Sequence, residues 1–132
     1  MKFKLDYHSS EPLYLQAVMQ IKKQIVTRQI KPGEKLLSVR ALAKELQLNP
    51  TTASRIFTQL ANEGIVVQRP GLGVFVSEEP PPFSGDFIRK ELDHQALNYL
   101  VEGLRYGLEY KELVHIVDIQ YQALKQEEAA SQ

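Results

Sequence analysis

The stretch SVRALAKELQLNPTTASRIFTQLANEG, residues 38–64, decides the fold because it holds two short helical patterns with a break between them. Ser38 and Asn49 are favoured N-cap residues, and Pro50 suits the first position of a helix. Gly64 suits the left-handed residue that ends one. The two apolar stripes are Val39, Leu42, Ala43 and Leu46, and then Ala53, Ile56, Phe57 and Leu60. Their spacing predicts a helix-turn-helix with its turn at Gln47-Leu48.

The second of these helices carries a polar row on the face that has no apolar residues. The row consists of Thr51, Thr52, Arg55, Thr58 and Gln59. An α-helix fits the major groove of B-DNA, where Thr, Gln and Arg can bind base edges or phosphates. The free N–H groups at the start of the helix also favour a phosphate. We interpret the row as a DNA-reading surface, with a merely solvated surface as the alternative.

The flanking sequence supplies another helix and a hairpin. Helical spacing predicts a helix that begins at Pro12 and stops before the turn at residues 31–33. Its apolar stripe is Tyr14, Ala17, Val18, Ile21 and Ile25. Residues 3–5 are expected to form a short strand. Residues 65–69 and 74–76 are rich in β-branched side chains and surround Pro-Gly-Leu-Gly, which predicts a two-stranded hairpin.

A proline-rich connector separates this part from the C-terminal part. EEPPPFSG, residues 78–85, contains three consecutive prolines, which neither a helix nor a central strand tolerates. We predict a DNA-binding domain at residues 1–77, a stiff linker at 78–85 and a two-helix segment at 86–132. The fold class is therefore mostly α with a small β-hairpin.

The two C-terminal helices carry apolar stripes that a lone helical hairpin cannot bury. Pairing with a second copy of the chain would bury them. The residues expected at this dimer interface are Ile88, Leu92, Tyr99, Leu100, Leu113, Ile116, Val117 and Tyr121.

Charge is divided between the two halves. Residues 1–77 contain eleven Lys and Arg against five Asp and Glu, a net charge of +6. Residues 78–132 contain five against eleven, a net charge of −6. The division indicates that only the first half meets a polyanion, unless it is accidental.

Several function classes lack support. The chain has no cysteine, which excludes disulfides and thiolate chemistry. His8, His94 and His115 have no partner at metal-ligand spacing, so no metal or other cofactor is expected. No nucleophile–base pair can be placed, so the chain is not expected to be an enzyme. No apolar run approaches the roughly 20 residues of a membrane span, so no membrane partner is expected.

A set of blocks carries a family resemblance. PLYLQ (12–16), KPGEKLLSVRALAKEL (31–46), LNPTTASR (48–55), L-x-x-EGI (60–65) and RPGLGVFV (69–76) resemble the winged helix of GntR-type bacterial transcription regulators. The short tail is similar to that of the YtrA-like branch, which implies dimerisation through it.

The resemblance implies DNA contacts from Arg40, Thr51 and Thr52, and from the backbone of Gly71 at the wing tip. Many members have an arginine where this chain has Ser54, so base readout is expected to shift to Arg55 or to weaken. Leu37 stands where the family usually has proline, and Pro50 where some relatives have arginine. The DNA-binding candidates are Ser38, Arg40, Asn49, Thr51, Thr52, Ser54, Arg55, Thr58, Arg69 and Gly71.

Together these observations predict a cytoplasmic, sequence-specific DNA-binding transcription regulator. We expect a repressor that binds a two-fold-related operator in double-stranded DNA as a homodimer. A small-molecule effector would act through the connector, and nothing in the sequence identifies it. The alternatives are a winged-helix module for protein–protein interaction or for RNA binding.

Overall fold

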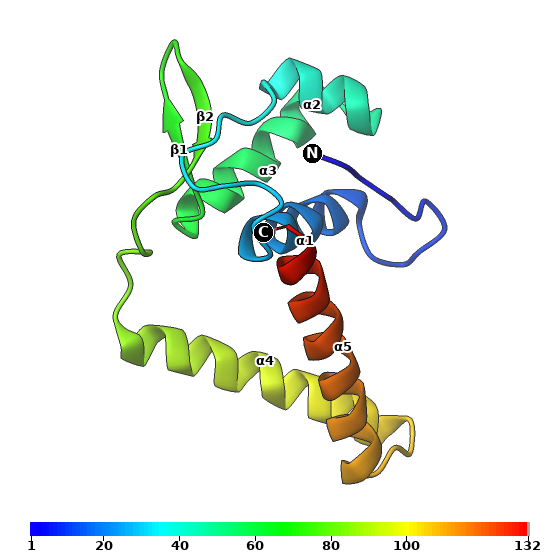
Figure 1. Cartoon of the computed structure of the whole chain (residues 1–132). Coiled ribbons are helices and arrows are strands. Elements are labelled where there is room, and N and C mark those ends of the chain that lie inside the picture. The colour runs from blue at the N-terminus through cyan, green and yellow to red at the C-terminus, as the bar shows by residue number, and fades with distance from the viewer. Residues whose placement is uncertain (132) are drawn as a thin grey trace. The chain divides into compact units, whose positions relative to one another are not determined.

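The computed structural model describes residues 1–131, which contain the expected helices and one two-stranded antiparallel sheet (Figure 1). The described residues divide into two compact units, Met1–Pro81 with the end of the chain from Glu127, and Pro82–Gln126. The elements are α1 (Leu13–Val26), α2 (Val39–Leu46), α3 (Pro50–Asn62), β1 (Val66–Arg69), β2 (Gly73–Val76), α4 (Gly85–Arg105) and α5 (Tyr110–Ala130). The predicted fold class, mostly α with a small hairpin, is confirmed.

Side-chain caps and one left-handed residue set the boundaries of α2 and α3. The Ser38 hydroxyl accepts a hydrogen bond from the Ala41 N–H at 3.0 Å, and Asn49 Oδ1 accepts one from the Thr51 N–H at 2.7 Å. Each cap satisfies a donor that the helix itself leaves free. Gln47 adopts φ 54° and ends α2, which turns the chain sharply toward α3.

One core joins the three N-terminal helices to the hairpin. Phe57 of α3 is fully buried, and the same cluster contains residues of α1 and α2. Burying a leucine or isoleucine contributes about 1.5–3 kcal/mol, so a cluster of this size holds α3 firmly. The buried members are Ala17, Val18, Ile21, Ile30, Leu36, Leu42, Ala43, Leu46, Ala53, Ile56, Phe57, Leu60, Val66, Val74 and Val76. With this face buried, the polar row of α3 must face outward.

The hairpin is anchored at its base and turns tightly at its tip. At the base, the Leu36 N–H donates to the Val74 carbonyl at 2.8 Å and the Val76 N–H to the Glu34 carbonyl at 2.9 Å. At the tip, the Leu72 N–H donates to the Arg69 carbonyl at 3.0 Å, closing a turn around Pro70-Gly71. Proline followed by a glycine at positive φ is the signature of a type II turn.

The expected strand at residues 3–5 is wrong, because the extended backbone there pairs with glutamine side chains instead of a strand. Gln20 accepts from the Lys4 N–H at 2.8 Å and donates to the Lys4 carbonyl at 2.8 Å. Gln16 makes the same two bonds with Asp6, at 2.8 and 3.0 Å. Gln24 makes them with Lys2, at 3.2 and 2.7 Å.

This glutamine ladder can form because four residues of α1 and two residues of the extended N-terminal segment cover similar distances. Four residues of a helix rise about 6.0 Å, and two residues of an extended chain rise about 6.6 Å. Successive glutamines, spaced four residues apart on α1, therefore meet alternate residues of the N-terminal segment, residues 1–6. The alternate residues of this segment, Met1, Phe3 and Leu5, pack against the core.

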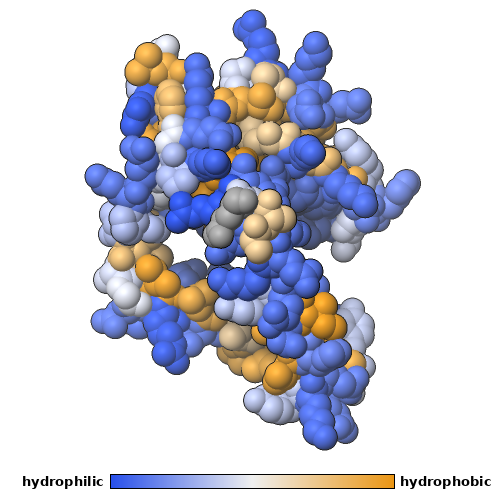
Figure 2. All heavy atoms as spheres, in the orientation of Figure 1, coloured by the Kyte–Doolittle hydropathy of each residue, from blue (hydrophilic) through white to orange (hydrophobic). Residues whose placement is uncertain are grey.

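The second unit is a helical hairpin with little interior of its own. Gly103 of α4 lets α5 approach closely, because a Cβ there would lie 2.1 Å from Leu113 Cδ2. The Tyr99 hydroxyl donates to the Leu113 carbonyl at 2.6 Å across the same crossing. Much of the remaining apolar surface is exposed, and Figure 2 shows apolar atoms at the surface along α4 and α5.

Candidate nucleic-acid interface

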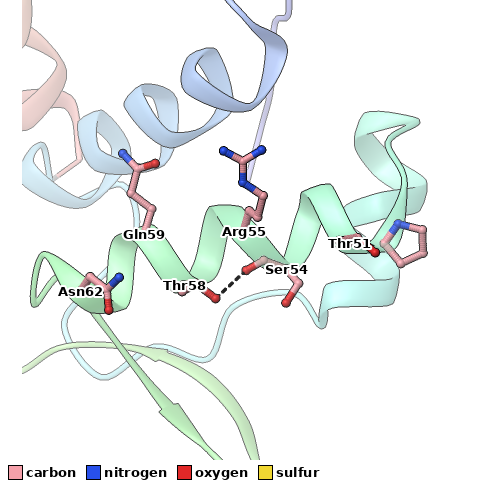
Figure 3. A pocket seen from close by; sticks show the side chains of 7 residues that line it. Thr51, Ser54, Arg55, Thr58, Gln59 and Asn62 are labelled. Carbon is pink, nitrogen blue, oxygen red and sulfur yellow. Dashed lines mark hydrogen bonds between the residues drawn. The ribbon is translucent and has the colours of Figure 1, made fainter.

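The outward face of α3 forms a shallow, open pocket lined only by its own side chains (Figure 3). The lining residues are Pro50, Thr51, Ser54, Arg55, Thr58, Gln59 and Asn62. All of these residues except Pro50 carry a hydroxyl, amide or guanidinium group, and each of these groups can bind base edges or phosphates. The structure thus brings most of the predicted α3 residues together on one surface.

The two edges of this face differ. Figure 3 shows Arg55 and Gln59 pointing toward α1, whereas Ser54 and Thr58 point to the opposite edge of the helix. The Thr58 hydroxyl donates to the Ser54 carbonyl at 3.0 Å, so its oxygen remains available as an acceptor. Thr52 is half-buried at the margin. The face therefore presents a cationic edge beside α1 and a hydroxyl edge opposite to it.

Two of the predicted contact residues also act as caps. Ser38 and Asn49 accept the backbone hydrogen bonds that begin α2 and α3. Their side-chain oxygens are thus partly committed to the helix ends. The Asn49 amide still has its NH₂ donors, and the Ser38 hydroxyl still has its proton. While these side chains cap the helices, they can bind a phosphate only by donating a hydrogen bond.

Three exposed arginines come from three different elements. Arg40 lies on α2, Arg55 on α3 and Arg69 at the end of β1. Within residues 1–131 none of them forms a salt bridge with a carboxylate. The guanidinium of Arg55 lies 4.4 Å from the centre of the Tyr14 ring, and that of Arg69 lies 4.9 Å from the Phe75 ring. These positive charges are available to phosphates.

The wing tip presents backbone to the surroundings. Gly71 has φ +75°, and a Cβ built there would meet no atom within 4 Å. A side chain at this position would thus strain the backbone without clashing with the protein. Leu72 beside it is 62% exposed. The tip is open enough for the chain to approach a ligand closely.

Asn62 is part of the α3 surface but was missing from the sequence-based candidates. It is exposed and lines the same pocket as Thr58. Its spacing of four from Thr58 and seven from Arg55 would have placed it on that face. Asn62 follows an apolar residue and is the last residue of α3, so its place on this face is less evident from the sequence.

Most of the residues predicted to mediate dimerisation lie at the surface of the helical hairpin. Ile88, Leu92, Leu100, Ile116, Val117 and Tyr121 are all exposed by more than a third, and Tyr99 is half-buried. Leu113 differs, because it is 2% exposed and packs on Gly103 of its own chain. Its role is to hold α4 and α5 together.

Metal-binding groups and membrane-spanning helices are both absent from the described residues. Residues 1–131 contain no group of three or more His, Cys, Asp and Glu that could hold a metal ion. In that same range, no helix combines the length and apolarity needed to cross a membrane.

Sequence comparisons relate this chain to bacterial regulatory proteins. The family model described as "Bacterial regulatory proteins, gntR family" matches residues 13–76. The HTH-type transcriptional regulator YhcF of Bacillus subtilis is 33% identical over 110 residues, which cover 83% of this chain and 89% of YhcF. The HTH-type transcriptional repressor YtrA of the same organism is 40% identical over 74 residues, covering 56% of this chain and 57% of YtrA.

Solved structures resemble the chain as well. A transcriptional antiterminator from Listeria monocytogenes EGD-e is similar with a TM-score of 0.85 and 25% identity, over 95% of this chain and 93% of that one. A GntR family transcriptional regulator from Listeria monocytogenes gives a TM-score of 0.61 and 30% identity, over 85% and 97%. YtrA from Sulfolobus acidocaldarius, at 24% identity and a TM-score of 0.54, shares the fold.

Proposed function

The chain belongs to the GntR family of bacterial regulatory proteins and is a DNA-binding transcription regulator, and from this premise we propose that it is a repressor that binds a two-fold-related operator as a homodimer. Two of its relatives, YtrA and NagR of Bacillus subtilis, are named as repressors. Because a regulator of bacterial genes acts where the DNA is, its proposed location is the cytoplasm.

The observation that carries the proposal is the polar face of α3, together with arginines on α2, α3 and the wing that form no salt bridge within residues 1–131. In the proposed complex α3 lies in the major groove, where Thr51, Ser54 and Thr58 bind bases or phosphates. Arg40 binds a phosphate beside it. Arg69 and the backbone of Gly71 approach the duplex from the wing. Phosphate contacts supply affinity, and the few base contacts supply register.

The homodimer is supported by the apolar surface of the helical hairpin. Leu92, Val117 and Tyr121 are each more than half exposed, which is unusual for side chains of this type at such density. A second copy would bury them in an isologous interface. Two tethered winged helices then occupy the two halves of the operator and block access to the promoter.

The proposal also includes a regulatory small-molecule ligand. A small-molecule effector would act by changing how the connector at residues 78–85 spaces the two DNA-binding units, and so by favouring a state that fits the operator poorly.

Selection of bound duplexes from a random library tests the proposal. The expected result is an enriched sequence with two inverted half-sites. The affinity for that duplex should fall by close to one logarithmic unit per contacted phosphate for each decade of salt. Arg40→Ala should lower this slope by about one.

Three results would contradict the proposal. Enrichment of a single asymmetric site would contradict the two-fold operator. Retention of double-stranded RNA, with no selection among DNA duplexes, would favour the RNA-binding alternative. Weak binding that barely changes between low and physiological salt would contradict electrostatic docking.

A further inference from the structure

The exposed arginine of α3 rests on an aromatic ring from a different helix. The guanidinium carbon of Arg55 lies 4.4 Å from the centre of the Tyr14 ring, within the range of a cation–π contact. Tyr14 belongs to α1, and it is half-buried and packed against the core of the winged helix. The ring is therefore a fixed platform, while the arginine above it is exposed.

Stacking of this kind restrains an arginine without using its hydrogen-bonding groups. A cation–π contact uses the charge of the guanidinium and does not consume its five N–H donors. A free arginine loses much rotamer freedom when it binds a phosphate or a guanine. An arginine already held on a ring loses less, so more of the contact energy appears as affinity.

Neighbouring arginines provide an internal contrast. Arg40 on α2 is exposed, and within residues 1–131 no aromatic ring is stacked against it. Arg69 on the wing lies over Phe75, but both belong to the same hairpin. Among these three arginines within residues 1–131, only Arg55 contacts an aromatic ring that comes from a helix outside the helix-turn-helix.

We propose that Tyr14 is a positioning residue, which holds Arg55 at the α1 edge of the recognition face in the orientation that contacts DNA. This inference rests on the proposed docking of α3 and deepens it by assigning α1 a role in recognition. Arg55 touches the duplex, and Tyr14 acts through Arg55.

The test is a double-mutant cycle on the full chain. The variants are Tyr14→Phe, Tyr14→Leu, Arg55→Ala and the pair Tyr14→Leu with Arg55→Ala. The probes are a duplex selected by the unmodified chain and a random-sequence duplex of equal length. Fluorescence anisotropy gives the affinity, and thermal unfolding reports whether each variant keeps its fold.

Tyr14→Leu should weaken binding to the selected duplex by about two- to fivefold, in line with an exposed cation–π contact. Tyr14→Phe keeps the ring and should bind like the unmodified chain. Once Arg55→Ala is present, Tyr14→Leu should cause no further loss. The random duplex should show a smaller effect, because only a register-specific contact needs a fixed orientation.

Four results would overturn the inference. An equal loss in Tyr14→Phe would mean that the hydroxyl, not the ring, contacts DNA. A loss that persists in the Arg55→Ala background would mean that Tyr14 acts through packing alone. Tighter binding by Tyr14→Leu would mean that the ring sequesters the arginine from DNA. If the unmodified chain bound no duplex, the proposed function would fall together with this role.

Discussion

The winged helix, residues 1–81, and the helical hairpin, residues 82–126, bury their apolar side chains to very different extents. Helices α1 to α3 and the wing share a continuous cluster whose largest member, Phe57, is fully buried. In the hairpin, by contrast, Leu113 is buried while Leu92, Leu97, Leu104 and their neighbours stay exposed. We infer that the first unit folds by itself, and we propose that the second supplies half of a dimer interface. On this proposal, folding depends on the first part of the sequence and assembly on the second.

The largest expected effect comes from removing the hairpin. A fragment that ends at Pro81 should still unfold cooperatively, because its core is intact. Its affinity for the two-fold operator should fall by about two to four orders of magnitude, since the second DNA-binding unit is no longer tethered. Anisotropy titrations of fragment and full chain measure this loss. On an isolated half-site the two should bind about equally, and a large difference there would show that the hairpin contacts DNA itself.

A smaller effect is expected at the contact that closes the hairpin. Gly103→Val places a branched side chain where Leu113 already lies, so the helices must separate. Overpacking of this kind costs about 1–3 kcal/mol in the free energy of unfolding and should also weaken the dimer. Gly85→Ala is the matched control, because a Cβ at Gly85 meets nothing within 4 Å. Equal thermal stability of both variants would contradict the close crossing of α4 and α5.

The wing tip allows charge to be separated from backbone strain. Gly71→Ala and Gly71→Glu both force a side chain into the left-handed region at φ +75°, and neither clashes with the protein. Their stabilities should therefore be similar. Gly71→Glu alone adds a negative charge beside the phosphates, which at about 4 Å in water corresponds to roughly 1 kcal/mol. It should bind DNA about fivefold more weakly than Gly71→Ala, and identical affinities would remove the wing from the interface.

The smallest effect concerns the glutamine ladder. Gln20→Met keeps the length of the side chain but loses both hydrogen bonds to Lys4. A net loss of about 1 kcal/mol in stability is expected, because each such bond contributes about 0.5–1.5 kcal/mol and these are open to water. Gln68→Met on the exposed face of β1 serves as a control in thermal unfolding. A ladder that contributed nothing would leave the two variants equally stable.

Periodicity and caps were enough to predict the recognition unit. Ser38, Asn49 and Pro50 fix the starts of α2 and α3, and these signals act over three or four residues. The same local rules predicted the hairpin and both C-terminal helices. Local rules failed at residues 3–5, which were predicted to form a short strand, because no short-range signal shows that this segment pairs with a row of glutamines on α1.

The rest of the site depends on contacts between distant residues. Nothing near Arg55 in the sequence indicates the Tyr14 ring, because the pairing arises only when α1 packs beside α3. Leu113 looked like an interface residue because its place in the apolar stripe is the same as that of its exposed neighbours. Only the glycine opposite it, Gly103, makes it an internal contact. Helical spacing could have revealed Asn62.

Sedimentation equilibrium of the full chain and of the fragment 1–81 tests the contrast between the two units most directly. We predict that the full chain has twice the 15.1 kDa mass of one copy, and that the fragment has the mass of a single folded copy. A stable dimer of the fragment would place the interface in the winged helix. A full chain that stays monomeric at micromolar concentration, with its apolar hairpin uncovered, would contradict the proposed dimerisation through the helical hairpin.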